Sequence, residues 1–157
     1  MATLHFTQKG ILFKTATATI LFGEGSEQAD AKLPLEGADE RFSVKDSLVK
    51  RHAFGTTFAL PDATIEYFPK TVKPKDAKTR RCNVLILGQH IEASKIIKAV
   101  SPRLAILHDG NIEHSRDIQK STGIQTISAG PGTVVNLKAY NALSSQQRLA
   151  SFTEQAE

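Results

Sequence analysis

The sequence lacks several features that would assign it at once to a functional class. Its 157 residues include no tryptophan, two tyrosines and a single cysteine, Cys82, which cannot form an internal disulfide. No apolar run approaches the ~20 residues that a membrane-spanning helix needs. Residues 1–10 also lack the basic and apolar stretches of a secretory signal. We therefore expect a cytoplasmic protein with no membrane contact.

The motifs of several large enzyme classes are missing as well. The chain has no GxxxxGK[ST] or GxGxxG loop, no HExxH, no paired-cysteine motif and no GxSxG. The sequences Gly23-Glu24-Gly25 and Gly130-Pro131-Gly132 indicate turns. Signatures of P-loop nucleotide binding, dinucleotide binding, zinc proteases and serine hydrolases are thereby excluded.

The overall composition is that of an ordinary globular protein. Hydrophobic residues make up 40% of the chain and charged residues 23%. The length predicts one domain, to which we assign residues 1–140, followed by a helix or tail over residues 141–157.

The net charge of +4 comes largely from one segment, Lys70 to Arg81, whose only acidic residue is Asp76. One interpretation is a solvated linker that joins two strands. The alternative is a nucleic-acid interface, although the few aromatic residues offer no evident stacking platform. Its candidate contact residues are Lys73, Lys75, Lys78, Arg80 and Arg81.

The first half of the chain predicts strands and one long loop. Residues 4–22 indicate two short strands around Lys9-Gly10, because Ile11, Phe13 and Thr15 alternate with polar or small residues. Residues 23–46 are polar and rich in turn residues, which predicts a long loop. Residues 56–60 and 64–68 predict a hairpin around Pro61-Asp62-Ala63.

The second half predicts alternating strands and helices. The apolar runs at residues 83–87 and 104–107 are typical of strands buried on both faces, and residues 124–128 and 133–137 predict two more. Helices are predicted at 91–100, ended by Pro102, and at 112–122, with Asn111 as N-cap and Gly123 as C-cap. The resulting β-α-β-α-β order predicts an α/β fold with a mixed sheet and parallel pairing in this half.

Two histidines follow predicted neighbouring strands. His90 comes after NVLIL and His108 directly after LAIL. Ligands of open α/β sheets bind at the carboxyl ends of strands, so the two rings could share one crevice. With Asp109, and with His114 in the first turn of the next helix, they form a candidate site for zinc or manganese. The alternative is that these histidines only bond to the backbone or cap loops.

Residues 82–137 (CNVLILGQHIEASKIIKAVSPRLAILHDGNIEHSRDIQKSTGIQTISAGPGTVVNL) resemble the C-terminal segment of metallo-β-lactamase-fold hydrolases. Within it, residues 102–108 match the strand that ends in a metal-binding histidine, and residues 122–137 match the closing hairpin. ATLHFTQKGILFKTATATILFG, residues 2–23, resembles the opening hairpin. The resemblance implies a reduced version of that family's layered architecture.

The metal-binding residues of that family are mostly missing. The HxHxDH motif is absent, and His5 and His52 are isolated. The counterpart of the family's Gly-Asp-Thr strand end is Tyr67 to Thr71, which puts Lys70 in place of the bridging aspartate. Only His108 carries over, whereas catalytic zinc normally has three protein ligands.

Three functions remain open at this point. The first is a non-catalytic binding or assembly module with no cofactor, completed by a second copy or a protein partner, because a reduced sandwich should leave an apolar sheet face. The second is a hydrolase with an altered single-metal site. Its ligands would be His90, His108, Asp109 and His114. The third is binding of nucleic acid through the basic segment 70–81.

Overall fold

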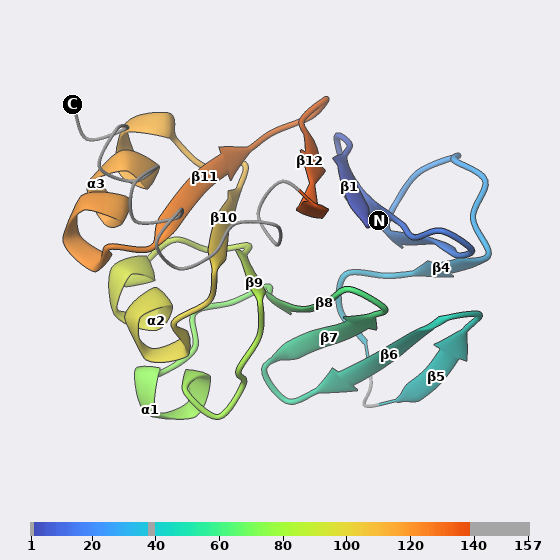
Figure 1. Ribbon diagram of the computed structural model, residues 1–157, viewed down its shortest axis with the longest axis horizontal. Helices are drawn as coiled ribbons and strands as arrows, with labels where there is room; N and C mark the ends of the chain where they lie inside the picture. Colours follow the sequence, from blue (N-terminus) through green and yellow to red (C-terminus); the bar gives the residue numbers. More distant parts are fainter. Residues whose placement is uncertain (1, 38–39, 139–157) are drawn as a thin grey trace.

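The computed structural model describes residues 2–37 and 40–138, and its elements form three layers (Figure 1). Within these residues the strands build a five-stranded sheet and a seven-stranded sheet, here called the small sheet and the large sheet. The small sheet packs on one face of the large sheet, and the helices cover the other face. The predicted helix or tail at 141–157 lies outside the described residues.

The small sheet brings together the two ends of the described chain. Its strand order is β12-β1-β2-β3-β4, antiparallel throughout except for the parallel pair β3 and β4. Its strands are β1 (Thr3–Phe6), β2 (Gly10–Lys14), β3 (Thr19–Gly23), β4 (Ala31–Leu33) and β12 (Val134–Asn136).

The large sheet is mixed, with the order β11-β10-β9-β8-β7-β6-β5. Strands β8 to β11 are parallel, whereas β5 to β8 form an antiparallel meander. Its strands are β5 (Arg41–Val44), β6 (Ser47–His52), β7 (Gly55–Leu60), β8 (Ala63–Phe68), β9 (Val84–Leu87), β10 (Leu104–His108) and β11 (Gln125–Ala129). The predicted α/β class with a β-α-β-α-β second half is confirmed.

The helices are α1 (Pro74–Ala77), α2 (Ala93–Val100) and α3 (Ile112–Thr122). The predicted ends of α3 are confirmed: the Asn111 side chain accepts hydrogen bonds from the backbone of Glu113 and His114, and Gly123 is the left-handed C-cap. Helix α2 ends at Val100, and its C-cap Ser101 is left-handed directly before Pro102, because proline disfavours a helical residue in front of it.

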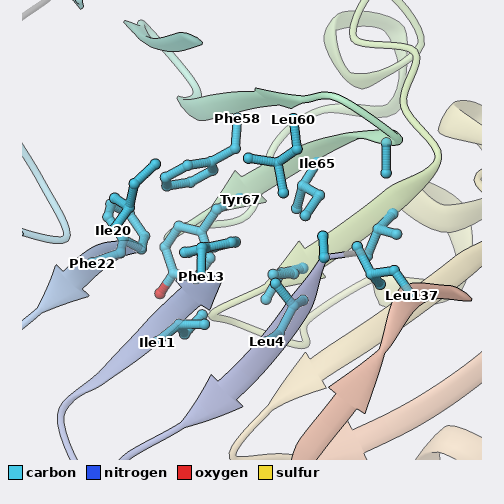
Figure 2. Close-up of a cluster of buried hydrophobic side chains, with 14 of the residues drawn as sticks. Leu4, Ile11, Phe13, Ile20, Phe22, Phe58, Leu60, Ile65, Tyr67 and Leu137 are labelled. Carbon is cyan, nitrogen blue, oxygen red and sulfur yellow. The ribbon is translucent and has the colours of Figure 1, made fainter. Parts of the chain in front are cut away.

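Two hydrophobic cores share the large sheet. Side chains of β9 alternate between them, with Val84 and Ile86 in the core between the sheets and Leu85 and Leu87 in the core under the helices. Figure 2 shows the first of these cores, where aromatic residues of the two sheets meet. Phe13 of β2 stacks on Phe58 of β7 with 4.2 Å between the ring centroids. This two-sided burial explains why VLIL, the sequence of β9, is continuously apolar.

The outer face of the small sheet is mainly polar. It carries residues such as His5, Lys14 and Lys32, which alternate with the core residues of the same strands. Leu12 and Leu21 on this face are only 7% and 1% exposed. Val134, which pairs with His5 on the same face, is 57% exposed, so the apolar sheet face that we expected a partner to cover stays an expectation.

Several element predictions are wrong. Residues 4–22 contain parts of three strands, because a turn at residues 15–18 separates β2 from β3. The predicted loop 23–46 contains β4 and β5, and β6 was missed. The linker 70–81 contains α1. Residues 122–137 are not a paired hairpin, because β11 joins the large sheet and β12 pairs with β1 in the small sheet.

Candidate functional site

The carboxyl ends of β8, β9 and β10 lie at one edge of the large sheet, because these strands are parallel and adjacent. The turn between β6 and β7 lies at the same edge, since β7 begins opposite the end of β8. We call this the carboxyl edge. It gathers residues 69–71, 88–90, 108–110 and 52–55, which follow or connect these strands.

His108 ends β10 with its ring turned toward the small sheet. The ring centroid lies 5.5 Å from that of Phe6 and 6.3 Å from that of Tyr67. The residue is 9% exposed, and its Nε2 has no hydrogen-bond partner among the described residues. Burial lowers the pKa of His108, against the opposing charge of Asp109, whose Oδ2 lies 3.8 Å from Nε2. The imidazole is therefore neutral at pH 7.

His90 contacts the backbone of His108 and not its ring. The Nε2 of His90 donates a hydrogen bond to the carbonyl oxygen of His108 over 3.0 Å. The ring of His90 lies near that of His114 on α3, with 6.3 Å between the centroids. His90 thus contacts the helix layer, whereas His108 contacts the small sheet.

These residues do not fit a zinc ion of the kind that the resemblance implies. No group of three or more His, Cys, Asp or Glu side chains that could hold a metal occurs within residues 2–37 and 40–138. His108 and Asp109 come close enough to share a cation, but catalytic zinc sites use three protein ligands. The other histidines are engaged elsewhere, His5 with Thr3 and His52 with Glu66.

Lys70 lies just beyond the end of β8, in the position that the resemblance gives to the bridging aspartate. Its Nζ lies 3.9 Å from Oε1 of Glu36, and both side chains are largely exposed, at 74% and 59%. An ion pair of this length and exposure contributes little to stability. The ammonium group therefore remains available at the carboxyl edge.

A row of buried polar side chains crosses the large sheet on the face toward the small sheet. Arg51 of β6 lies opposite Thr56 of β7, which lies opposite Tyr67 of β8. The Oγ1 of Thr56 and the Nε of Arg51 have no hydrogen-bond partner in the described part of the chain. Burial and the negative charges of Asp109 and Glu36 raise the pKa of Tyr67 to about 12, so its phenol stays protonated.

Arg51 also holds the segment that precedes β5. Its Nη2 donates to the carbonyl oxygen of Pro34, and its Nε lies 3.5 Å from Oε1 of Glu40. The guanidinium carbon lies 5.8 Å from the ring centroid of Phe22. Arg51 is thereby fixed in place beside Gly37, where an added Cβ would lie 3.4 Å from the guanidinium carbon.

A cleft of about 370 Å³ opens beside these side chains. Its walls are residues 35–37, the β6–β7 turn with Arg51 to Thr56, and residues 69–72 after β8. Gly55 is required in the turn because a Cβ there would lie 1.9 Å from the carbonyl oxygen of Tyr67. The cleft thus combines an apolar wall at Phe54 with the polar groups of Arg51, Thr56 and Lys70.

A second buried polar group lies on the opposite face of the large sheet. His52 and Glu66 are paired over 2.8 Å, with side chains 5% and 3% exposed, and Thr57 donates its hydroxyl to the same carboxylate. The Nδ1 of His52 accepts the backbone N–H of Phe54, so Nε2 carries the proton that bonds to Glu66. This pair fixes the β6–β7 turn, which forms one wall of the cleft.

The basic segment does not form one uniformly free surface. Lys73, Lys75, Lys78 and Arg81 are exposed on or beside α1. Arg80 is half-buried, and its guanidinium carbon lies 5.8 Å from the ring centroid of Phe54. Arg80 therefore supports the wall of the cleft, whereas the other four cations face solvent.

Sequence reasoning missed Arg51, Thr56 and Glu66. A signal was present for two of them, because Arg51 stands at an inward position of the alternating strand SLVKRH and Glu66 interrupts the apolar strand ATIEYF. A charge inside a strand pattern indicates burial with a partner or a site. Thr56 offers no such signal, since threonine is common in strands.

Comparisons with known proteins give one line of support for the resemblance. No family model and no curated protein sequence matches the chain. A crystal structure assigned as a Zn-dependent hydrolase of the metallo-β-lactamase superfamily from Thermotoga maritima matches with a TM-score of 0.50 and 10% sequence identity. The match covers 68% of this chain and 74% of that one. The chain therefore has a metallo-β-lactamase-like α/β fold.

Proposed function

We propose that this protein is a non-catalytic binding module on a metallo-β-lactamase-like scaffold, and that its ligand binds in the cleft at the carboxyl edge. The observation that carries the proposal is the side-chain content of this edge. Lys70 follows β8, the ring of His108 packs against Phe6 and Tyr67, and His90 bonds to backbone. Among the described residues, the edge thus offers a binding cleft but not three convergent metal ligands.

Metal titration tests this proposal. Protein treated with a chelator is titrated with zinc and with manganese, and its thermal unfolding is recorded with and without each ion. We expect no stoichiometric binding that depends on His108 and no change in unfolding temperature. A resident metal at a hundredfold excess over its Kd would stabilise the fold by about 2.7 kcal/mol, which is readily measured.

The matched variants are His108→Ala at the carboxyl edge and His5→Ala on the outer face of the small sheet. One zinc per chain that is lost in His108→Ala but kept in His5→Ala would contradict the proposal. That result would support the hydrolase alternative, which is favoured by the 3.8 Å approach of His108 Nε2 to Asp109 Oδ2. Phosphodiesters and esters would then be the substrates to screen.

Assembly with a second copy or a protein partner is the other part of this proposal. Three large hydrophobic side chains are exposed in the described part of the chain: Ile91, Ile112 and Val134, at 70%, 63% and 57%. Ile91 and Ile112 follow β9 and β10 at the carboxyl edge. Light scattering measures the mass in solution, and a monomer at all concentrations would contradict self-assembly.

A further inference from the structure

We infer that the cleft beside β8 binds a small ligand through an oxyanion group, a phosphate or a carboxylate. This inference rests on the proposed function, because it assigns a ligand class to the same cleft. Its carriers are the Thr56 hydroxyl, the Arg51 guanidinium and the Lys70 ammonium group, which all belong to residues lining that cleft.

The cleft has the size and shape of a ligand site. Its volume of about 370 Å³ lies in the range of about 300–1,000 Å³ that is typical of small-molecule pockets. Its walls come from three segments far apart in the sequence, and two of these are fixed. Arg51 bonds to the backbone of Pro34, and the His52–Glu66 pair holds the β6–β7 turn. A site that is formed before binding loses less entropy when a ligand enters.

Among the described residues, the Oγ1 of Thr56, which lines the cleft, lacks a partner, and the Nε of Arg51 has only the 3.5 Å ion pair with Glu40. Thr56 is 1% exposed and Arg51 4% exposed, yet the Oγ1 of one and the Nε of the other have no hydrogen bond in the described part of the chain. Buried polar groups are almost always paired, because leaving one unpaired is costly. Since the two residues are direct neighbours across β6 and β7, a ligand oxygen that bonds to the Thr56 hydroxyl would lie near the Arg51 guanidinium.

The charge of the cleft selects an oxyanion over a cation. Arg51 is always protonated, and Lys70 is held only by a long, exposed pair with Glu36. Glu36 lies on the rim and Glu40 lies 3.5 Å from Arg51, so each carboxylate partly offsets one cation. An oxyanion displaces Glu36 from Lys70, accepts from Thr56 and lies near the buried guanidinium. A cation would meet both positive groups, and the two nearby carboxylates, Glu36 and Glu40, are already paired with Lys70 and Arg51.

The test uses inorganic phosphate and acetate as probes at constant ionic strength, with binding followed by calorimetry and by backbone amide NMR shifts. We expect saturable binding with shifts at residues 51–56 and 69–72. The phosphate and acetate arms distinguish the two sources of the oxyanion, because the tighter of the two identifies the group that the natural ligand carries.

The variants are Thr56→Val, which removes the hydroxyl at constant shape, and Lys70→Gln, which removes an exposed charge. Each should weaken binding about five- to tenfold, whereas the control Lys98→Gln, at an exposed position of α2, should leave it unchanged. Circular dichroism verifies that all three variants fold. The inference is overturned if neither probe saturates, or if both cleft variants bind as tightly as the original protein. If phosphate and acetate do not bind and zinc does not bind at His108 either, only the oxyanion inference fails and the proposed function stands. If zinc binds at His108, the proposed function is overturned, whether or not phosphate binds.

Discussion

At the scale of single residues, burial determines what the side chains of the carboxyl edge can do. The ring of His108 packs between Phe6 and Tyr67, and Tyr67 is itself buried beside His108. Their pKa values move in opposite directions, since burial lowers the pKa of the imidazole and raises that of the phenol. Both effects favour the neutral form. The edge is thus less charged than its composition suggests.

His108 should make the fold sensitive to acid. Its pKa in the folded state lies below the ordinary value of 6.5, so below that pH the unfolded chain binds a proton that the folded chain does not. The free energy of unfolding therefore falls as the pH drops from about 7 to about 5. In His108→Gln, the free energy of unfolding, measured by urea titration at both pH values, should fall less between them than in the original protein. Equal slopes would contradict the assignment, and His114→Gln on the exposed start of α3 is the control.

Cys82 should be an unreactive thiol. Burial, followed by the negative charge of Glu66, raises its pKa to about 12, so the thiolate that reacts with alkylating agents is scarce near pH 8. Iodoacetamide should modify the native protein at least about a hundredfold more slowly than the urea-unfolded chain. Glu66→Gln should accelerate the native reaction only modestly, because burial is the larger cause. Rapid modification of the native protein would contradict this prediction.

At the scale of elements, α3 is the segment whose local sequence is most self-sufficient. Asn111 bonds to the first turn, Glu113 and Lys120 lie at the ends that the helix dipole favours, and Gly123 ends the helix in the left-handed conformation. Strand β8 is the contrasting case. Its alternation places Tyr67 in one core and Glu66 on the opposite face, so its role depends on both neighbouring layers.

The N-cap of α3 gives a prediction at this scale. Asn111→Ala should lower the free energy of unfolding by about 1 kcal/mol, because the backbone N–H groups of Glu113 and His114 lose their side-chain acceptor. Asn111→Asp should retain most of the stability. Lys120→Ala on the exposed face of the same helix should change it by less than about 0.5 kcal/mol. Urea titration measures the free energy of unfolding of all three variants. An Asn111→Ala variant as stable as the original protein would show that the cap contributes nothing.

At the scale of the whole molecule, the large sheet is common to both hydrophobic cores. Ile86 lies in the core between the sheets. The residue before it in β9, Leu85, points to the opposite face and lies in the core under the helices. Neither core can lose its packing without freeing a face of the same strands. We infer that the three layers form one cooperative unit.

Two core truncations test this cooperativity. Ile86→Ala and Leu85→Ala should each cost about 2–5 kcal/mol, since both side chains are fully buried. Both should lower the midpoint of the same single transition when unfolding is followed by far-UV circular dichroism and by tyrosine fluorescence. If either variant unfolds in two separate steps, the layers are independent. Lys50→Ala on an exposed position of β6 is the neutral control.

Membrane contact and association also belong to this scale. None of the helices in the described part of the chain is long and apolar enough to cross a bilayer. The expectation of a homo-oligomer or a protein partner depended on an apolar sheet face, and the described outer face of the small sheet is mainly polar. Association therefore stays a prediction, as does nucleic-acid binding by Lys73, Lys75, Lys78, Arg80 and Arg81.

The sequence by itself determined the elements whose signals are local. VLIL and LAIL are apolar at every position because both faces of β9 and β10 are buried, and capping residues mark α3 directly. Only the tertiary structure decided which sheet each strand joins, since pairing depends on long-range register. It thus placed β12 beside β1, paired β4 with β3 and made β6 a wall of the cleft. The candidate site was decided in the same way, because Arg51, Thr56 and Lys70 are separated in the sequence and meet only when β6, β7 and β8 align.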